Sequence, residues 1–162
     1  MRTFPCCAIL LSAFVASTAI AAVPVNGNPS ASAKSHARFS TRFYTMLWDA
    51  PDRLDYSYRN GELSLHVQHF GSGAEGADLQ LRVRADKPGR FRIPSAAAAS
   101  FSVLGCEHTV GGGSYVQITR IDAAHIEGRF ELQGHCAELP SASETLRNGR
   151  FDLVFDAPTR KR

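Results

Sequence analysis

The chain has 162 residues, of which 44% are hydrophobic and 20% are charged, and its formal net charge at pH 7 is +3. This length predicts a single domain, and the composition is typical of neither a disordered chain nor a membrane-spanning protein. Acidic and basic residues are mixed along the sequence, so the charge pattern gives no indication of nucleic-acid binding.

Residues 1–21 have the pattern of a secretory signal peptide. Arg2 provides the positive charge, a long apolar run follows, and Ala19 and Ala21 are small residues at the positions that signal peptidase requires. An uncleaved anchor is the alternative, but the apolar run is shorter than the roughly 20 residues needed to span a bilayer. No cysteine for lipid attachment follows the run. We therefore expect cleavage near Ala21/Ala22 and a periplasmic or secreted protein without a stable membrane anchor.

Residues 22–37 have the composition of a flexible linker and show no periodicity. From residue 38 onward, apolar and polar residues alternate with a period of two, which predicts β-strands with one apolar face. The clearest examples are Leu63–Val67, Leu79–Val83, Phe91–Ile93 and Phe151–Phe155. The turn signals Asn60-Gly61 and Asn148-Gly149 each precede such a segment.

Short strands separated by turn signals predict an all-β fold, an antiparallel β-sandwich or barrel of about eight strands. We expect one β domain at 38–157 and a basic tail at 158–162. Pro94–Ser100 and Ser141–Leu146 are the best helix candidates, and each is short.

Cleavage of the signal peptide would leave two cysteines, Cys106 and Cys136. In an oxidising compartment an isolated pair predicts an intradomain disulfide. The first alternative is a zinc site in which the two cysteines bind the metal together with His108 and His135. The second is that both cysteines are free thiols. Because adjacent residues in an extended chain point in opposite directions, His135 and Cys136 are poorly placed to share a metal. We expect no metal and no cofactor.

The candidate binding residues are Ser114, Tyr115, Trp48 and His125. Three glycines before Ser114 and Tyr115 would allow a close approach to a ligand, although a flexible hairpin loop explains the same string. Trp48 lies in an aromatic segment of the kind found at binding hot spots, although core packing is the preferred explanation for such residues. His125 follows a turn-like segment and is interpreted as an exposed loop residue able to act as an acid or base.

Three segments contain short motifs of alternating apolar and polar residues, namely Ile118–Asp122, His125–Leu132 and Leu146–Phe155. Together they resemble the C-terminal half of small β-rich bacterial envelope proteins of uncharacterised function, with Ile-Thr-x-x-Asp, Ile-x-Gly-x-Phe and Asn-Gly-x-Phe strands. The resemblance implies a β fold and an envelope location, and it transfers no catalytic residue. Many of those proteins are lipoproteins, whereas this chain lacks the lipidation cysteine.

The sequence contains none of the nucleophile, zinc-protease, phosphate-loop or dinucleotide motifs. We therefore expect a non-catalytic binding module whose ligand is a glycan, a small molecule or a protein, with no assigned catalytic residue. One alternative is an inhibitor or immunity protein against an envelope-directed hydrolase, inserting the Gly111–Tyr115 loop. A hydrolytic enzyme using His125, or His66 on its strand, is the other.

Overall fold

The structure is a computed structural model and describes residues 35–42, 47–48, 51–70, 76–94, 97–139 and 141–155. The predicted signal peptide, most of the predicted linker and the predicted basic tail lie outside the described residues. The first strand begins at His36, two residues before the expected start of the domain. Among the described residues, no helix is long and apolar enough to cross a bilayer.

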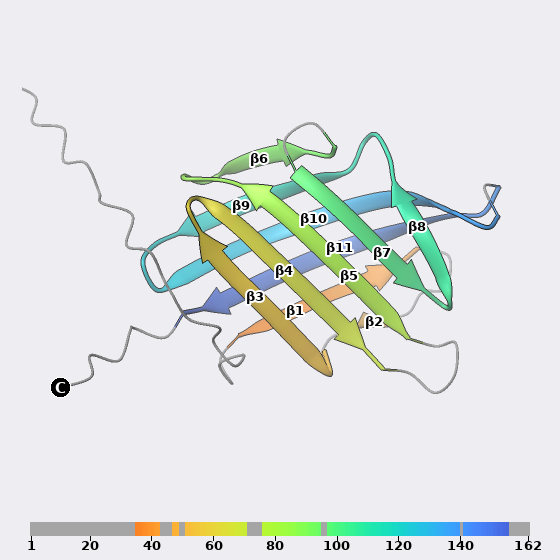
Figure 1. The fold of residues 1–162 in the computed structure, drawn as a ribbon, viewed down its shortest axis with the longest axis horizontal. Coiled ribbons are helices and arrows are strands. Elements are labelled where there is room, and N and C mark those ends of the chain that lie inside the picture. The colour runs from red at the N-terminus through yellow and green to blue at the C-terminus, as the bar shows by residue number, and fades with distance from the viewer. Residues whose placement is uncertain are drawn as a thin grey trace, which may run out of the picture.

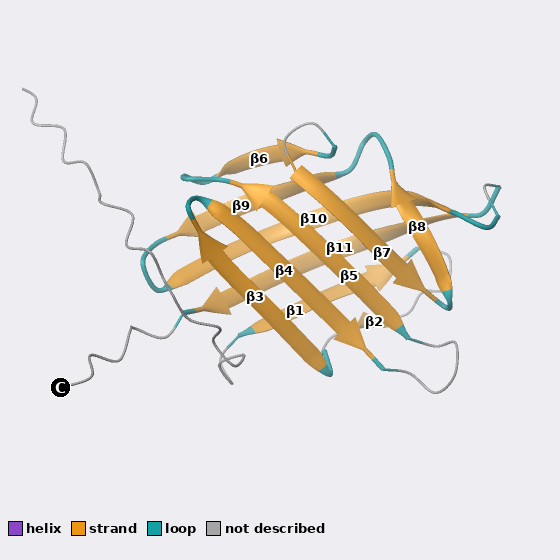
Figure 2. Ribbon diagram, in the orientation of Figure 1, coloured by secondary structure: helices purple, strands orange, loops and turns teal. Residues whose placement is uncertain are grey.

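Every regular element in the described part of the chain is a strand and every strand pairing is antiparallel, which confirms the predicted fold class (Figure 2). The described residues contain eleven strands rather than about eight: β1 His36–Thr41, β2 Leu47–Trp48, β3 Arg53–Arg59, β4 Glu62–His69, β5 Ala77–Arg84, β6 Gly89–Arg92, β7 Ala97–Val103, β8 Cys106–Val110, β9 Tyr115–Ile121, β10 His125–Cys136 and β11 Ser143–Val154. Both helix candidates are wrong, because Ala97 and Ser143 each begin a strand.

The strands form two layers that cross each other (Figure 1). One layer has the order β3-β4-β5-β7-β8, and the other has the order β2-β1-β11-β10-β9-β6. Strand β10 joins the layers, because residues 126–131 pair with β9 whereas residues 134–136 pair with β8. The described strands therefore form one continuous sheet that folds over at β10 into two facing layers and is nearly closed, like a barrel.

The core lies between the layers and follows the predicted alternation. In β4, Leu63, Leu65 and Val67 are buried, and their partners in β5 are also buried. Aromatic residues of the second layer close the core from the other side, including Phe39, Phe130 and Phe151. Polar residues at the alternate positions point outward. The outer face of each layer is consequently polar and available for function.

The two predicted Asn-Gly turns have different outcomes. Asn60 and Gly61 have φ angles of 52° and 75° and form the two-residue connection between β3 and β4, as predicted. Asn148 also has a positive φ of 54°, but it lies inside β11. The register shifts there, so that two residues of β11 occupy the space opposite Glu131 of β10. The predicted turn at Asn148-Gly149 is therefore wrong, and the segment is a β-bulge.

Cys106 and Cys136 form the predicted disulfide, with their Cα atoms 5.8 Å apart. The bond connects the start of β8 to the end of β10, at the edge where the two layers join. Because both sulfur atoms are part of the disulfide, neither can act as a thiolate ligand, and the alternative zinc site does not form. The two histidines of that alternative also diverge, because His108 is buried whereas His135 is exposed.

Candidate functional site

Two rows of polar side chains run across the outer face of the β1-β11-β10 sheet. In the first row, Arg38 of β1 lies opposite Arg150 of β11, which lies opposite Arg129 of β10. All three arginines are exposed and line an open depression of about 510 Å³. Like charges directly opposite each other in neighbouring strands destabilise a sheet. The row therefore concentrates positive charge and lowers the stability of the sheet.

The second row lies two residues further along the same strands. His36, Asp152, Glu127 and Arg120 are in register from β1 through β11 and β10 to β9. His125 lies on the same face of β10 as Glu127, because residues two apart in a strand point to the same side. This row brings two carboxylates together with two imidazoles, those of His36 and His125.

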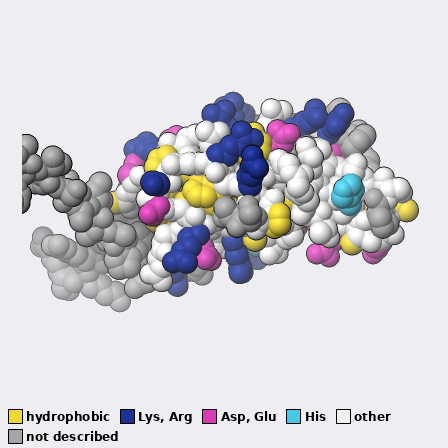
Figure 3. Space-filling model, turned by 90° about the horizontal axis from the view of Figure 1, so that it is seen from above, with side chains coloured by type: hydrophobic (Ala, Val, Ile, Leu, Met, Phe, Trp, Pro, Cys, Tyr) yellow, Lys and Arg dark blue, Asp and Glu magenta, His cyan; other side chains and the backbone are white. Residues whose placement is uncertain are grey.

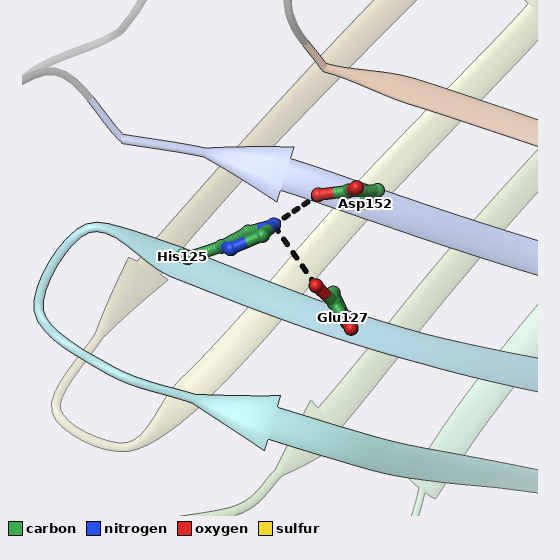
Figure 4. Close-up of side chains that lie close together, drawn as sticks. All are labelled: His125, Glu127 and Asp152. Carbon is green, nitrogen blue, oxygen red and sulfur yellow. Dashed lines mark hydrogen bonds and ion pairs between the residues drawn. The ribbon is translucent and has the colours of Figure 1, made fainter.

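His125, Glu127 and Asp152 form a compact cluster (Figure 4). The Nε2 atom of His125 forms a hydrogen bond with Asp152 Oδ1 and lies 3.5 Å from Glu127 Oε1. One nitrogen and two carboxylate oxygens thus lie within 4.8 Å of one another. The His125 side chain is 19% exposed, so the imidazole is partly shielded while solvent still reaches the carboxylates.

Backbone hydrogen bonds fix the position of His125. The β9–β10 turn is closed by Asp122 N donating to His125 O at 2.9 Å. Within the turn, Ala124 N donates to Asp122 Oδ1 at 3.0 Å, and Phe155 N donates to Ala124 O at 2.8 Å. The turn is therefore attached to the end of β11, which carries Asp152. Both sides of the cluster consequently belong to one hydrogen-bonded unit.

The nearest cation to the cluster, Arg120, is shared between two acids. Its Nε atom lies 2.7 Å from Asp122 Oδ2, whereas its Nη1 atom lies 3.6 Å from Glu127 Oε1. The hydrogen bond from Ala124 N, together with Arg120, lowers the pKa of Asp122 below its ordinary value. Arg120 is thus engaged mainly by Asp122, and His125 contacts both cluster carboxylates.

An imidazole between two carboxylates can transfer a proton or coordinate a metal ion. Within the described residues, no hydroxyl or thiol is hydrogen-bonded to His125, so the nucleophile–base contact of covalent catalysis is not formed. A second pair of this kind lies on the other layer, where His66 Nε2 is 2.8 Å from Asp78 Oδ2. Gln68 Nε2 donates to the same oxygen at 2.7 Å, so that pair contains one carboxylate and an amide.

The side chain of Ser114 has a structural role. Its hydroxyl is buried, accepts a hydrogen bond from Gln133 N at 2.8 Å and donates to Gln133 O at 3.3 Å. These bonds occur where β10 passes from its pairing with β9 to its pairing with β8. The side chain replaces strand hydrogen bonds at this junction and is not presented to a ligand.

The other predicted binding residues are dispersed over the molecule. Tyr115 begins β9 and lies 3.7 Å below the guanidinium carbon of Arg90, beside a shallow depression that also adjoins Gly113. Trp48 is in the two-residue strand β2, where it pairs with Phe39. His125 is the first residue of β10 rather than a loop residue. The four residues therefore do not form one site.

The sequence interpretation missed Glu127, Asp152 and the three arginines of the first row. The signal for Glu127 is local, because His125 and Glu127 are two positions apart in a segment predicted as a strand and therefore lie on the same face. Asp152 lies 27 residues from His125 and approaches it only through the register of β10 with β11. Nothing in the sequence pattern specifies that register.

No protein-family model matches the chain, and no curated protein or solved structure shows significant similarity to it.

Proposed function

We propose that this chain is a non-catalytic binding module of an oxidising, extracytoplasmic compartment, and that it binds an acidic glycan on the outer face of β1, β11 and β10. The observation that carries this proposal is the row formed by Arg38, Arg150 and Arg129. The disulfide is compatible with an oxidising compartment, and the N-terminal sequence has the pattern of a secretory signal.

The spacing of the row suits a linear polyanion. Neighbouring strands lie about 4.8 Å apart, so three strands place three guanidinium groups along a line of about 10 Å. Each guanidinium can donate two parallel hydrogen bonds to a carboxylate, sulfate or phosphate group. Within the described residues, Arg129 and Arg150 form no ion pair, so their donors are available. A bound anion would also relieve the repulsion between the arginines.

Charge alone does not distinguish this face, because basic side chains occur in several groups over the molecule (Figure 3). A control must therefore remove equal charge elsewhere. Arg82 and Arg84 of β5 provide it, since both are exposed on the outer face of the other layer. The double variants Arg129→Gln/Arg150→Gln and Arg82→Gln/Arg84→Gln have the same net charge.

The experiment is isothermal titration calorimetry with an oligogalacturonide and with its methyl-esterified counterpart, which has the same backbone without the charges. We expect the wild type to bind the acid form and not the ester, with affinity that falls as salt is raised. Arg129→Gln/Arg150→Gln should weaken binding at least tenfold, whereas Arg82→Gln/Arg84→Gln should change it less than twofold. Equal losses in the two variants, equal binding of the ester, or no binding of the acid form would overturn the proposal.

A further inference from the structure

We propose that His125, Glu127 and Asp152 form a binding site for a divalent transition-metal ion, with Zn²⁺ as the best match. Glu127 and Asp152 line the same depression as the three arginines, on the neighbouring row of side chains, and the metal proposal does not depend on the glycan proposal. One imidazole nitrogen and two carboxylate oxygens form a ligand set that suits Zn²⁺, with one tetrahedral position left for water.

One separation within the cluster already matches the spacing of two zinc ligands. Ligand atoms at about 2.0–2.1 Å from a tetrahedral zinc ion lie about 3.4 Å from one another. The separation between His125 Nε2 and Glu127 Oε1 is 3.5 Å, and all three ligand atoms lie within 4.8 Å. Asp152 Oδ1 is hydrogen-bonded directly to His125 Nε2, so the Asp152 side chain would have to rotate away from the imidazole to let the ion enter between them.

The fold brings the two carboxylates together in a way that favours a cation. Glu127 and Asp152 are directly opposite each other in neighbouring strands, an arrangement that is unfavourable for two like charges. Arg120 contacts only Glu127 of the pair, at 3.6 Å, and is held mainly by Asp122 at 2.7 Å. A divalent ion between the carboxylates would neutralise both charges, whereas a protonated His125 would neutralise one.

The ligands are also held on a rigid support. His125 and Glu127 project from the same face of β10, and Asp152 projects from β11, to which β10 is paired over most of its length. The turn before His125 is closed by backbone hydrogen bonds and attached to Phe155 after β11. Binding a metal here would order three side chains but no backbone.

The molecule contains a matched control for this proposal. His66 and Asp78 form a similar His–carboxylate pair on the other layer, at 2.8 Å, but their third neighbour is the amide of Gln68 rather than a second carboxylate. If a histidine with one acid were sufficient for binding, both places would take up zinc. The proposal requires that only the site with two carboxylates does so.

The test is equilibrium dialysis of the chelator-treated protein against ZnCl₂, with the bound metal measured by atomic emission. We expect one equivalent of Zn²⁺ in the wild type and in His66→Gln. Affinity should fall at least tenfold in His125→Gln and in Asp152→Asn. Asp152→Asn is the conservative variant, because the amide retains the shape of the carboxylate and one of its oxygens. Glu131→Gln, which changes another acid on the same face of β10, should bind like the wild type.

Two further measurements separate metal ligation from a structural role. Bound Zn²⁺ should raise the thermal unfolding midpoint of the wild type but not that of Asp152→Asn, because a ligand stabilises only a fold that binds it. The ¹⁵N resonance of His125 Nε2 should shift on addition of Zn²⁺, and that of His66 should not. Absence of bound Zn²⁺ in the wild type, unchanged affinity in His125→Gln, or loss of affinity in His66→Gln would each overturn the proposal.

Discussion

The ring of Phe151 covers Gly128, its direct partner across strands β11 and β10. A Cβ atom added at Gly128 would overlap Phe151 Cζ and lie 2.7 Å from Gln117 O. The neighbouring pair repeats this relationship in reverse, because Gly149 of β11 is opposite Phe130 of β10 and is covered by its ring. The Ile-x-Gly-x-Phe and Asn-Gly-x-Phe segments are thus two halves of one reciprocal packing unit, in which each glycine accommodates the phenylalanine of the other strand.

Gly128→Ala and Gly149→Ala should each destabilise the protein by about 1–3 kcal/mol, since the added methyl group overpacks a filled core. Urea unfolding would measure the loss. Gly112→Ala is the control, because a Cβ there meets no atom within 4 Å. In the double variant Gly128→Ala/Phe151→Ala the two effects should be less than additive, because the ring that clashes with the methyl group is gone. Strict additivity would show that the ring is not the cause.

Replacing both cysteines, as Cys106→Ser/Cys136→Ser, should lower the free energy of unfolding by roughly 3–4 kcal/mol. The disulfide closes a loop between residues 30 positions apart, and the expected loss reflects the greater entropy of the unfolded chain without that closure. Urea unfolding of the wild type in the presence of reductant should match the double variant. A wild type that keeps its full stability after complete reduction would contradict this account.

His108 should make stability sensitive to mild acid. Burial against Phe101 lowers the pKa of His108 below 6.5, although the hydrogen bond to Cys106 O and the charge of Glu144 act in the opposite direction. Below about pH 6.5 the unfolded chain therefore takes up a proton that the folded state resists, and the free energy of unfolding decreases as the pH falls toward the lowered pKa.

The check is the difference in unfolding free energy between pH 7.5 and pH 5.5. We expect His108→Phe, which preserves stacking on Phe101, to show a smaller difference than the wild type. His135→Gln removes a smaller cause of the lowered His108 pKa, and should therefore reduce the difference less than His108→Phe does. An unchanged difference in His108→Phe would assign the acid sensitivity to other groups.

Ser114→Ala should cost about 1–3 kcal/mol in thermal or urea unfolding. The substitution leaves Gln133 N without the acceptor that Ser114 Oγ provides in a buried place, and such unsatisfied groups are costly. Ser64→Ala, on the outer face of β4, should change stability by less than about 0.5 kcal/mol. Equal effects of the two substitutions would mean that the Ser114 hydroxyl contributes nothing specific.

Sequence patterns predicted the parts of this fold that local chemistry determines. The alternation at Leu63–Val67 and Leu79–Val83 is a property of a single strand, and β4 and β5 appear where it occurs. The alanines at 97–99 suggested a helical turn, but their pairing with β5 makes them a strand. Asn148 has the positive φ expected of a turn residue, yet its neighbours on both sides extend the strand, and the result is a bulge.

The candidate site was less predictable for the same reason. Period-two alternation places His125 and Glu127 on one face, and it also places Arg129 there. Which residues oppose them depends on the pairing of β10 with β11, between residues about 20 apart, and of β11 with β1, between residues about 110 apart, and these registers are set by packing of the whole core. Two acids or three arginines in a line across strands are consequently invisible in a linear sequence.

The edge at which β10 changes partners also determines how the molecule would come apart. Only three residues of β10 pair with β8, whereas the opposite edge of the sandwich is held by side chains, including a hydrogen bond of 2.5 Å from Tyr56 Oη to Val154 O. The disulfide reinforces this short pairing covalently. Reduction should therefore loosen the end of β10 and β8 first, while the buried core still holds the two layers together. Amide protons of β8 would then exchange with solvent long before those of β4 and β5.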